Sequence, residues 1–126
     1  TASYALLYFY RLRNFNGMAV EYVLHVEDSM VYKMQNGNYA VVKVQNKGET
    51  TIWARTEKKT KLELNIEHGK VYFVNCSVGM GVLMGHPKLE LVETQRGLEE
   101  FEMCREERAI RSVPRSKRKW EDDIYR

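Results

Sequence analysis

The chain has 126 residues, of which 20 are Lys or Arg and 17 are Asp or Glu, giving a formal net charge of +3. This length suits one domain, and a composition of 44% hydrophobic and 29% charged residues excludes a chain that is disordered throughout. No apolar run approaches the roughly 18–20 residues of a membrane-spanning helix. Two cysteines are too few for a disulfide-rich miniprotein.

Apolar residues between positions 3 and 92 recur with a period of two, the period of β-strands. Clusters of Gly, Asn and Lys interrupt them roughly every 8–12 residues. The pattern predicts an all-β fold, a sandwich of about eight mainly antiparallel strands. The predicted strands cover residues 4–12, 20–26, 30–34, 39–44, 50–55, 61–66, 70–78 and 88–92.

The first predicted strand carries apolar side chains on both faces, with Ala5, Leu7 and Phe9 on one of them. A strand buried on both sides is expected at the centre of its sheet. The strand at 61–66 instead alternates leucine and isoleucine with charged and polar residues, which predicts one face in the core and one in water.

The dipeptide Asn36-Gly37 separates two alternating runs. A type I′ turn needs positive φ at both central residues, and Asn and Gly tolerate that conformation best. The sequence therefore predicts a tight β-hairpin between the strands at 30–34 and 39–44.

After Thr94 the apolar spacing changes to three and four residues, which predicts a short C-terminal helix of about three turns. We expect Leu98 and Phe101 to rest on the strands. Thr94 is a candidate N-cap, and Gly97 weakens the first turn by roughly 1 kcal/mol relative to Ala. Residues 1–104 are thus predicted to form the sandwich domain with its terminal helix, and residues 105–126 a charged extension.

The net charge resides in that extension. Residues 105–126 hold eight basic and five acidic residues, so residues 1–104 are balanced at 12 of each. Nucleic-acid binding is not favoured, because the strand region has no basic stripe. Docking to a partner, including a second copy in a homodimer, is the preferred role of the tail. The candidate contact residues are Arg115, Lys117, Arg118, Lys119, Trp120 and Tyr125.

A series of short motifs recurs in a fixed order: Tyr8-Phe9-Tyr10-Arg11, Asn16-Gly17, Asn36-Gly37-Asn38-Tyr39, Lys47-Gly48, the stretch 62–74 and the stretch 87–92. Their order and spacing resemble an uncharacterised family of small bacterial secreted proteins and lipoproteins, known as a domain of unknown function. The resemblance covers residues 2–101. The family usually has Pro-Gly where this chain has Lys47-Gly48, and Asp-Gly where it has Asp28-Ser29, but both pairs keep turn chemistry.

The resemblance implies a PEGA-like or prealbumin-like β-sandwich. It also implies export to the periplasm or outer cell envelope, with membrane attachment only through an N-terminal lipid anchor outside this chain. It implies no known activity.

The two cysteines leave two alternatives open. A disulfide between Cys76 and Cys104 would join the helix to the strands and stabilise the fold by about 3 kcal/mol. Two buried free thiols are the preferred alternative, because cysteine is among the most buried residue types.

No pattern in the chain indicates catalysis. The histidines, His25, His68 and His86, lie tens of residues apart and fit no metal-ligand spacing. We therefore expect no metal, no cofactor and no enzymatic activity.

Eight tyrosines, most of them in predicted strands, suggest an aromatic face that could stack sugar rings. The candidate stacking residues are Tyr22, Tyr32, Tyr39 and Trp53. Tyrosine is also simply a good strand residue, and that explanation is preferred. The resulting prediction is a non-catalytic binding or structural module of the bacterial cell envelope, recognising protein or glycan. The alternative is a cytoplasmic adaptor whose basic tail contacts nucleic acid or acidic protein.

Overall fold

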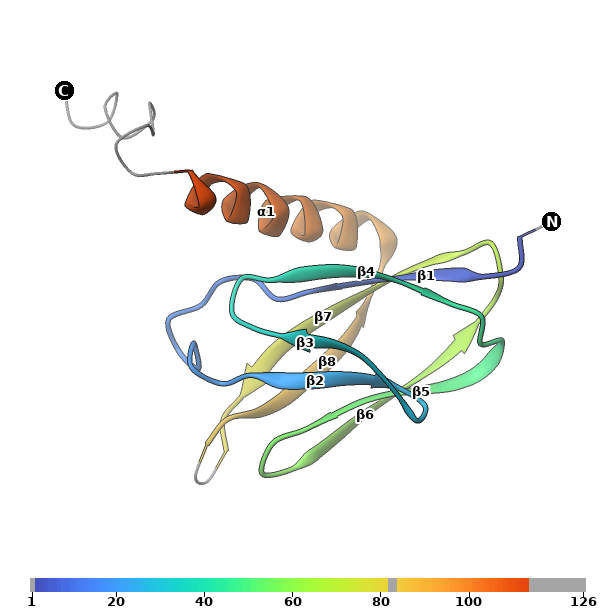
Figure 1. The fold of residues 1–126 in the computed structure, drawn as a ribbon, viewed down its shortest axis with the longest axis horizontal. Helices are drawn as coiled ribbons and strands as arrows, with labels where there is room; N and C mark the ends of the chain where they lie inside the picture. Colours follow the sequence, from blue (N-terminus) through green and yellow to red (C-terminus); the bar gives the residue numbers. More distant parts are fainter. Residues whose placement is uncertain (1, 82–83, 114–126) are drawn as a thin grey trace.

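The computed structural model describes residues 2–81 and 84–113. This part of the chain forms eight strands and one helix: β1 (Ala5–Tyr10), β2 (Tyr22–Val26), β3 (Ser29–Met34), β4 (Tyr39–Val44), β5 (Gly48–Arg55), β6 (Lys59–Ile66), β7 (Val71–Gly79), β8 (His86–Val92) and α1 (Thr94–Ser112). The strands make two four-stranded sheets, with the orders β4–β1–β7–β8 and β3–β2–β5–β6 (Figure 1). The predicted eight strands and mostly β architecture are confirmed.

Strand β1 lies between β4 and β7, as its two apolar faces predicted. It runs antiparallel to β4 and parallel to β7, the one parallel pairing among the described strands. Ala5, Leu7 and Phe9 are almost fully buried on the face toward the main core. Tyr8 and Tyr10 belong to a second cluster on the opposite face.

The main hydrophobic cluster takes residues from both sheets. Its fully buried residues come from β1 to β7, and the partly buried Leu89 of β8 packs against it. In β6, Leu64 and Ile66 enter the cluster, while the alternating residues Lys61, Glu63 and Asn65 are exposed. This alternation confirms the prediction of a half-buried strand.

The predicted hairpin at Asn36-Gly37 is wrong. The turn exists, because the backbone N–H of Asn38 donates to the Gln35 carbonyl at 3.1 Å. However, β3 and β4 belong to different sheets. Of the two central residues only Gly37 has positive φ, at 74°, which is the type II pattern and not type I′. A type II turn does not match the twist of a paired hairpin, so here it carries the chain from one sheet to the other.

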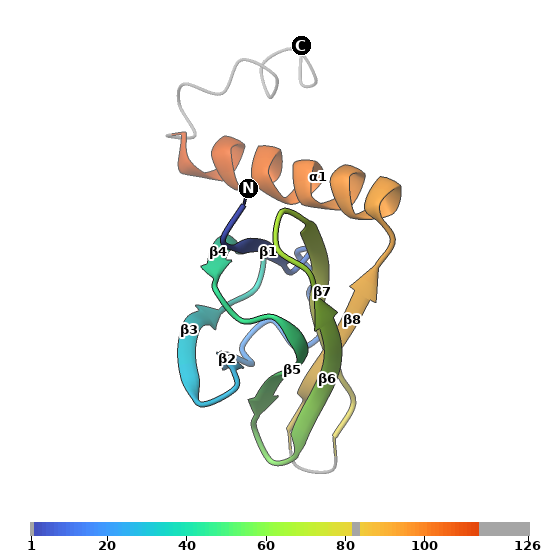
Figure 2. The same ribbon diagram turned by 90° about the vertical axis from the view of Figure 1, so that its right-hand side faces the viewer.

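Helix α1 lies across sheet β4–β1–β7–β8, on the side away from the other sheet (Figures 1 and 2). It has 19 residues and is longer than predicted. Its buried residues are Gly97, Phe101 and Cys104, whose spacing of four and three places them on one face. Leu98 is turned about 100° from Gly97 and is 52% exposed, so its predicted contact is wrong. Within the described residues, no helix has the length and hydrophobicity needed to cross a bilayer.

The helix begins with a different cap from the one predicted. The Glu93 carboxylate accepts hydrogen bonds from the backbone N–H groups of Gln95, at 3.2 Å, and Arg96, at 2.7 Å. Glu93 is therefore the N-cap, and Thr94 is already helical. The longer Glu side chain reaches forward to the free N–H groups of the first turn, a role for which sequence preference favours Thr.

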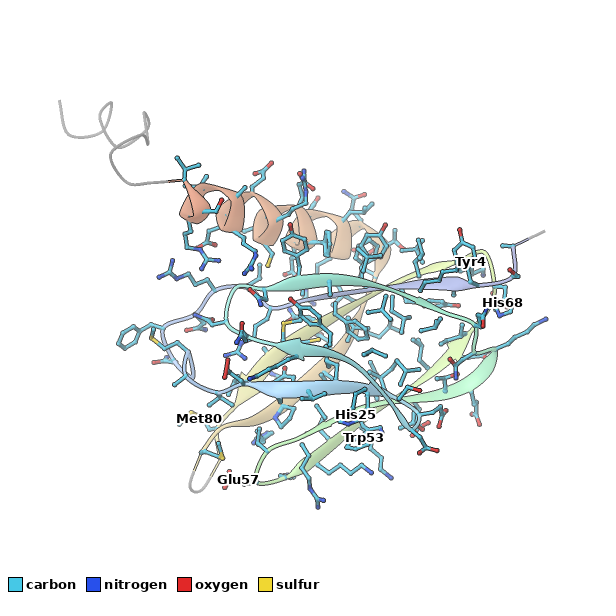
Figure 3. The ribbon with its side chains drawn as sticks, in the orientation of Figure 1. Tyr4, His25, Trp53, Glu57, His68 and Met80 are labelled. Carbon is cyan, nitrogen blue, oxygen red and sulfur yellow. The ribbon has the colours of Figure 1, made fainter. Side chains whose placement is uncertain are left out.

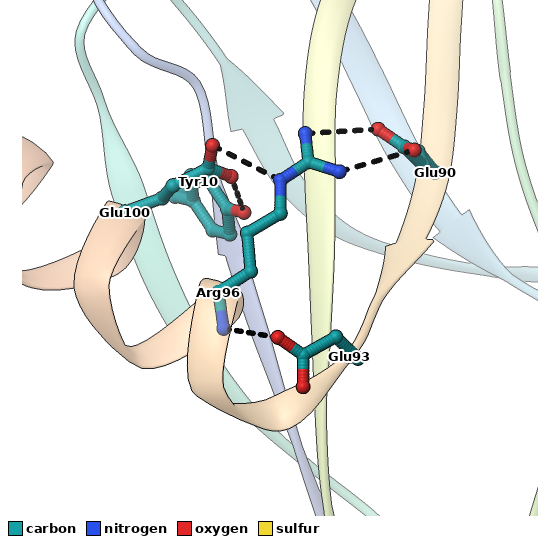
Figure 4. A network of polar contacts seen from close by, with 5 residues as sticks. All are labelled: Tyr10, Glu90, Glu93, Arg96 and Glu100. Carbon is teal, nitrogen blue, oxygen red and sulfur yellow. Dashed lines mark hydrogen bonds and ion pairs between the residues drawn. The ribbon is translucent and has the colours of Figure 1, made fainter.

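A polar network then fixes the first turns of α1 to the sheet (Figure 4). The Tyr10 hydroxyl donates to Glu100 at 2.5 Å, and Arg96 bonds Glu100 at 3.2 Å and Glu90 at 3.4 Å. Burial and then the hydrogen bond to Glu100 raise the pKa of Tyr10 above its ordinary value. The helix is thus joined to both β1 and β8.

The last turns of α1 contact the turn between β3 and β4. Arg108 donates to the Asn38 side-chain oxygen, and Arg111 donates to the Gly37 carbonyl at 3.3 Å. Residues 105–112 therefore belong to the helix and pack against the strand region.

Candidate functional site

The predicted stacking residues do not share one surface. Tyr22 is buried and donates its hydroxyl to the Ser77 carbonyl at 2.7 Å. Tyr32 packs partly against the main core, and Tyr39 lies beneath α1 with its ring centroid 5.3 Å from that of Phe101. These tyrosines support packing, which was the preferred explanation for their number.

Trp53 lies apart from them, on the side of sheet β3–β2–β5–β6 that faces away from the main core. Its ring stacks on His25 with the centroids 3.7 Å apart and the planes 6° from parallel (Figure 3). The Lys59 ammonium lies 4.2 Å from the Trp53 ring centroid. His25 and Lys59 come from β2 and β6, the strands on either side of β5, so they cover opposite faces of the indole. Both π-faces of Trp53 are occupied, which fixes its orientation.

Glu27 connects this ring to the backbone. The Trp53 indole N–H donates to the Glu27 carbonyl at 2.8 Å. The Thr51 N–H donates to the Glu27 carboxylate at 2.9 Å, and the Glu27 N–H donates to the Thr51 carbonyl at 2.9 Å. Glu27 has φ 52° and is the one residue other than glycine with positive φ in the described part of the chain. Such a conformation costs of order 1–3 kcal/mol and persists only where contacts enforce it.

We call the side of β2, β5 and β6 that points away from the main core the outer face. Its side chains are those of Val23, His25, Glu49, Thr51, Trp53, Arg55, Lys59, Lys61, Glu63 and Asn65. The centre is aromatic and half-buried, and the rim is exposed and carries both cationic and acidic side chains. No described element lies over it, whereas α1 covers the corresponding side of the other sheet (Figures 1 and 2).

His25 adds a polar atom to the centre of the outer face. Its Nδ1 is buried and has no hydrogen-bond partner among the described residues. Buried ring nitrogens normally find a partner, so the unpaired His25 Nδ1 is unusual.

Cys76 and Cys104 are free thiols in the structure. Cys76 lies in the main core and Cys104 in the second cluster beneath α1. Burial raises the pKa of both thiols above the ordinary value. The arrangement is that of two buried free thiols, the preferred alternative, and not that of a disulfide. A buried thiol of raised pKa is a poor nucleophile, since the thiolate is the reactive form.

We therefore expect both thiols to be protected in the folded protein. At pH 8, a thiol-specific disulfide reagent should modify the native chain at least about a hundredfold more slowly than the chain in denaturant. In denaturant without any reductant, two thiols per chain should react. Fewer than two would mean that the cysteines are oxidised, and rapid modification of the native protein would contradict the burial.

The other predicted site residues fall elsewhere. The candidate tail contacts, Arg115, Lys117, Arg118, Lys119, Trp120 and Tyr125, lie outside the described residues. Within residues 2–81 and 84–113, no three His, Cys, Asp or Glu side chains form a group that could hold a metal ion.

A family model matches residues 1–87, more than half of the chain; the family is DUF2846, a protein family of unknown function. The chain belongs to DUF2846. The resemblance to a domain of unknown function is thereby confirmed, although the match ends inside β8 and short of the predicted residue 101. No curated protein and no solved structure matches the chain.

The DUF2846 match contains the whole outer face, from Val23 to Asn65, but none of α1. Sequence reasoning identified Trp53 and missed its partners. Nothing local in the sequence links His25 to Trp53. The two are directly opposite in the β2–β5 register, which becomes visible only when the strands pair.

Proposed function

We propose that the protein is a non-catalytic binding module of the bacterial cell envelope and that its outer face recognises a protein partner. In this proposal the two sheets close into a sandwich of the PEGA-like or prealbumin-like kind, with α1 as a cover on one side. The partner binds the other side, the outer face.

One observation carries the proposal: the uncovered sheet surface has a fixed aromatic centre. Trp53 is held by His25, Lys59 and the Glu27 carbonyl. A side chain that is already ordered loses little rotamer entropy on binding, where ordering costs about 0.5–1.5 kcal/mol per side chain. Tryptophan, tyrosine and arginine are the residues that most often dominate binding energy in protein interfaces. The strained Glu27 backbone fits a functional role for this region.

The contacts of Trp53 also favour protein over glycan as the partner. Stacking of a sugar ring needs a free aromatic face. His25 and Lys59 occupy both faces of the indole, and the tyrosines proposed for stacking are packed against the core or the helix. The exposed side chains at the rim, Arg55, Lys61 and Glu63, are suited to charge pairing with another protein surface.

The envelope location is supported by the family resemblance alone. Its test is fractionation of the full-length gene product in its own bacterium. We expect the protein with the periplasmic or membrane fraction, and recovery in the cytosol would contradict this part of the proposal.

The outer face is tested by affinity capture from the envelope fraction. Wild-type protein should enrich one envelope protein, and the double variant Arg55→Glu/Lys61→Glu should reduce that enrichment at least about tenfold, because it reverses two rim charges. The matched control Lys47→Glu/Lys70→Glu changes the same charge away from the face. Equal loss in both double variants, or no envelope protein enriched by the wild type, would refute the role of the outer face.

A further inference from the structure

Apart from the outer face, the structure has a cavity at the C-terminal end of β1, beside β7. It is a cavity of about 190 Å³ between the segment 11–16 and the end of β7. Six polar residues contribute to its lining: Arg11, Arg13, Asn14, Asn16, Asn75 and Ser77. Among the described lining residues the charged side chains are both arginines, and there is no carboxylate. The cavity is therefore electropositive.

Arg11 is the unusual member of this set, because its side chain is only 3% exposed. Its guanidinium donates to the Val20 carbonyl at 2.7 Å and to the Gly17 carbonyl at 2.9 Å, and lies 6.0 Å from the Tyr22 ring centroid. No carboxylate forms an ion pair with it in the described part of the chain. Burial lowers the pKa of Arg11. A buried charge without a counter-charge is costly, so an anion nearby would stabilise it.

Arg13 is exposed and also makes no ion pair with a described residue. Its planar guanidinium presents a fork of N–H donors that matches two oxygens of a carboxylate or phosphate. Both arginines line the cavity and thus provide one buried and one accessible positive charge there.

Neutral donors complete the lining. The side chains of Asn16, Asn75 and Ser77 make no hydrogen bond to any described residue. The Asn14 side-chain oxygen accepts from the Asn16 backbone N–H at 3.0 Å, which leaves the Asn14 amide N–H₂ as a donor. In the β7–β8 register Lys88 lies directly across from Ser77 and Glu90 across from Asn75, and Glu90 is paired with Arg96. Amide, hydroxyl and guanidinium donors, with no carboxylate among the lining residues, form a set suited to an oxyanion.

We propose that this cavity is an oxyanion-binding site, which takes inorganic phosphate or a carboxylate or phosphate group of a larger ligand. Arg13 binds the anion through its guanidinium fork, Arg11 supplies positive charge from below, and the Asn and Ser side chains donate to the remaining oxygens. The site is separate from the outer face and does not depend on the function proposed for that face.

The test is a titration of the isotope-labelled full chain with sodium phosphate, followed by amide chemical shifts at constant ionic strength and pH. Shift changes should be saturable and confined to residues 11–16 and 75–78. Sodium acetate, titrated in the same way, distinguishes a site for phosphate groups from one that also takes carboxylates. We expect Arg13→Gln to weaken phosphate binding at least about tenfold, because it removes the accessible guanidinium fork.

Lys47→Gln is the matched control, since it removes one exposed positive charge outside the cavity. It should change the dissociation constant by less than about twofold. Equal weakening by both variants would show general charge attraction and overturn the site. Shifts scattered over all basic residues, no saturable shift with either anion, or stronger binding of an uncharged methyl glycoside would also overturn it.

Discussion

Replacing Phe101 with alanine should reduce the free energy of unfolding by about 3–5 kcal/mol, the usual cost of removing a buried phenylalanine side chain. Phe101 is 8% exposed and lies at the centre of the second cluster. Its ring centroid is 5.0 Å from that of Tyr8, 5.3 Å from Tyr39 and 6.2 Å from Tyr10. The substitution would leave a cavity under α1 and remove these edge-to-face contacts. Urea denaturation monitored by circular dichroism measures the loss.

The control for this substitution is Leu98→Ala in the same helix. Leu98 is 52% exposed, so the loss should stay below about 1 kcal/mol. Both variants change a large apolar helical residue to alanine, and their difference isolates burial under the helix. Losses of equal size would mean that α1 does not dock on the sheet through Phe101.

The variant Gly97→Ala should also destabilise the protein, by about 1–2 kcal/mol. A Cβ atom built on Gly97 lies 2.4 Å from both Cβ and Cγ of Phe73, which is closer than two carbon atoms can approach. Relieving the overlap moves the helix or the strand, and overpacking typically costs about 1–3 kcal/mol. Alanine regains up to about 1 kcal/mol of helix propensity, so the net effect is smaller than the clash.

Ala109→Gly, at an exposed position of α1, separates these two contributions. If helix propensity alone mattered, Gly97→Ala would stabilise and Ala109→Gly would destabilise, each by about 1 kcal/mol. If close packing dominates at Gly97, both variants lose stability. Thermal and urea denaturation of the two proteins decide between these results, and a gain in stability for Gly97→Ala would refute the packing.

Gly97 also shows what helix propensity alone does not predict about this chain. In the sequence, Gly97 is a weak point in the first turn of a helix. In the structure it is the position at which α1 comes closest to β7, because the absence of a side chain admits the Phe73 ring. Helix propensity depends on the residue itself, whereas this contact depends on a strand more than 20 residues earlier in the chain.

The candidate site was predictable only in part, because it too depends on contacts between segments far apart in the chain. Trp53 stood out by residue type, but the side chains that fix it, His25, Lys59 and Glu27, come from other strands and a turn. Which strands are neighbours follows from sheet topology. The type II turn at Asn36-Gly37 moves the chain to the other sheet, and β2 pairs with β5, which places His25 on Trp53.

The sequence by itself determined the eight strands, the buried and exposed faces of β1 and β6, and membership of a family of unknown function. These properties depend on residues two positions apart or on motifs within one segment, so they can be deduced without knowing the neighbours. Only the tertiary structure decided which strands pair, where α1 docks and which side chains surround Trp53 and Arg11. Those contacts join segments far apart in the chain, and their formation depends on how side chains from different strands fit together in space.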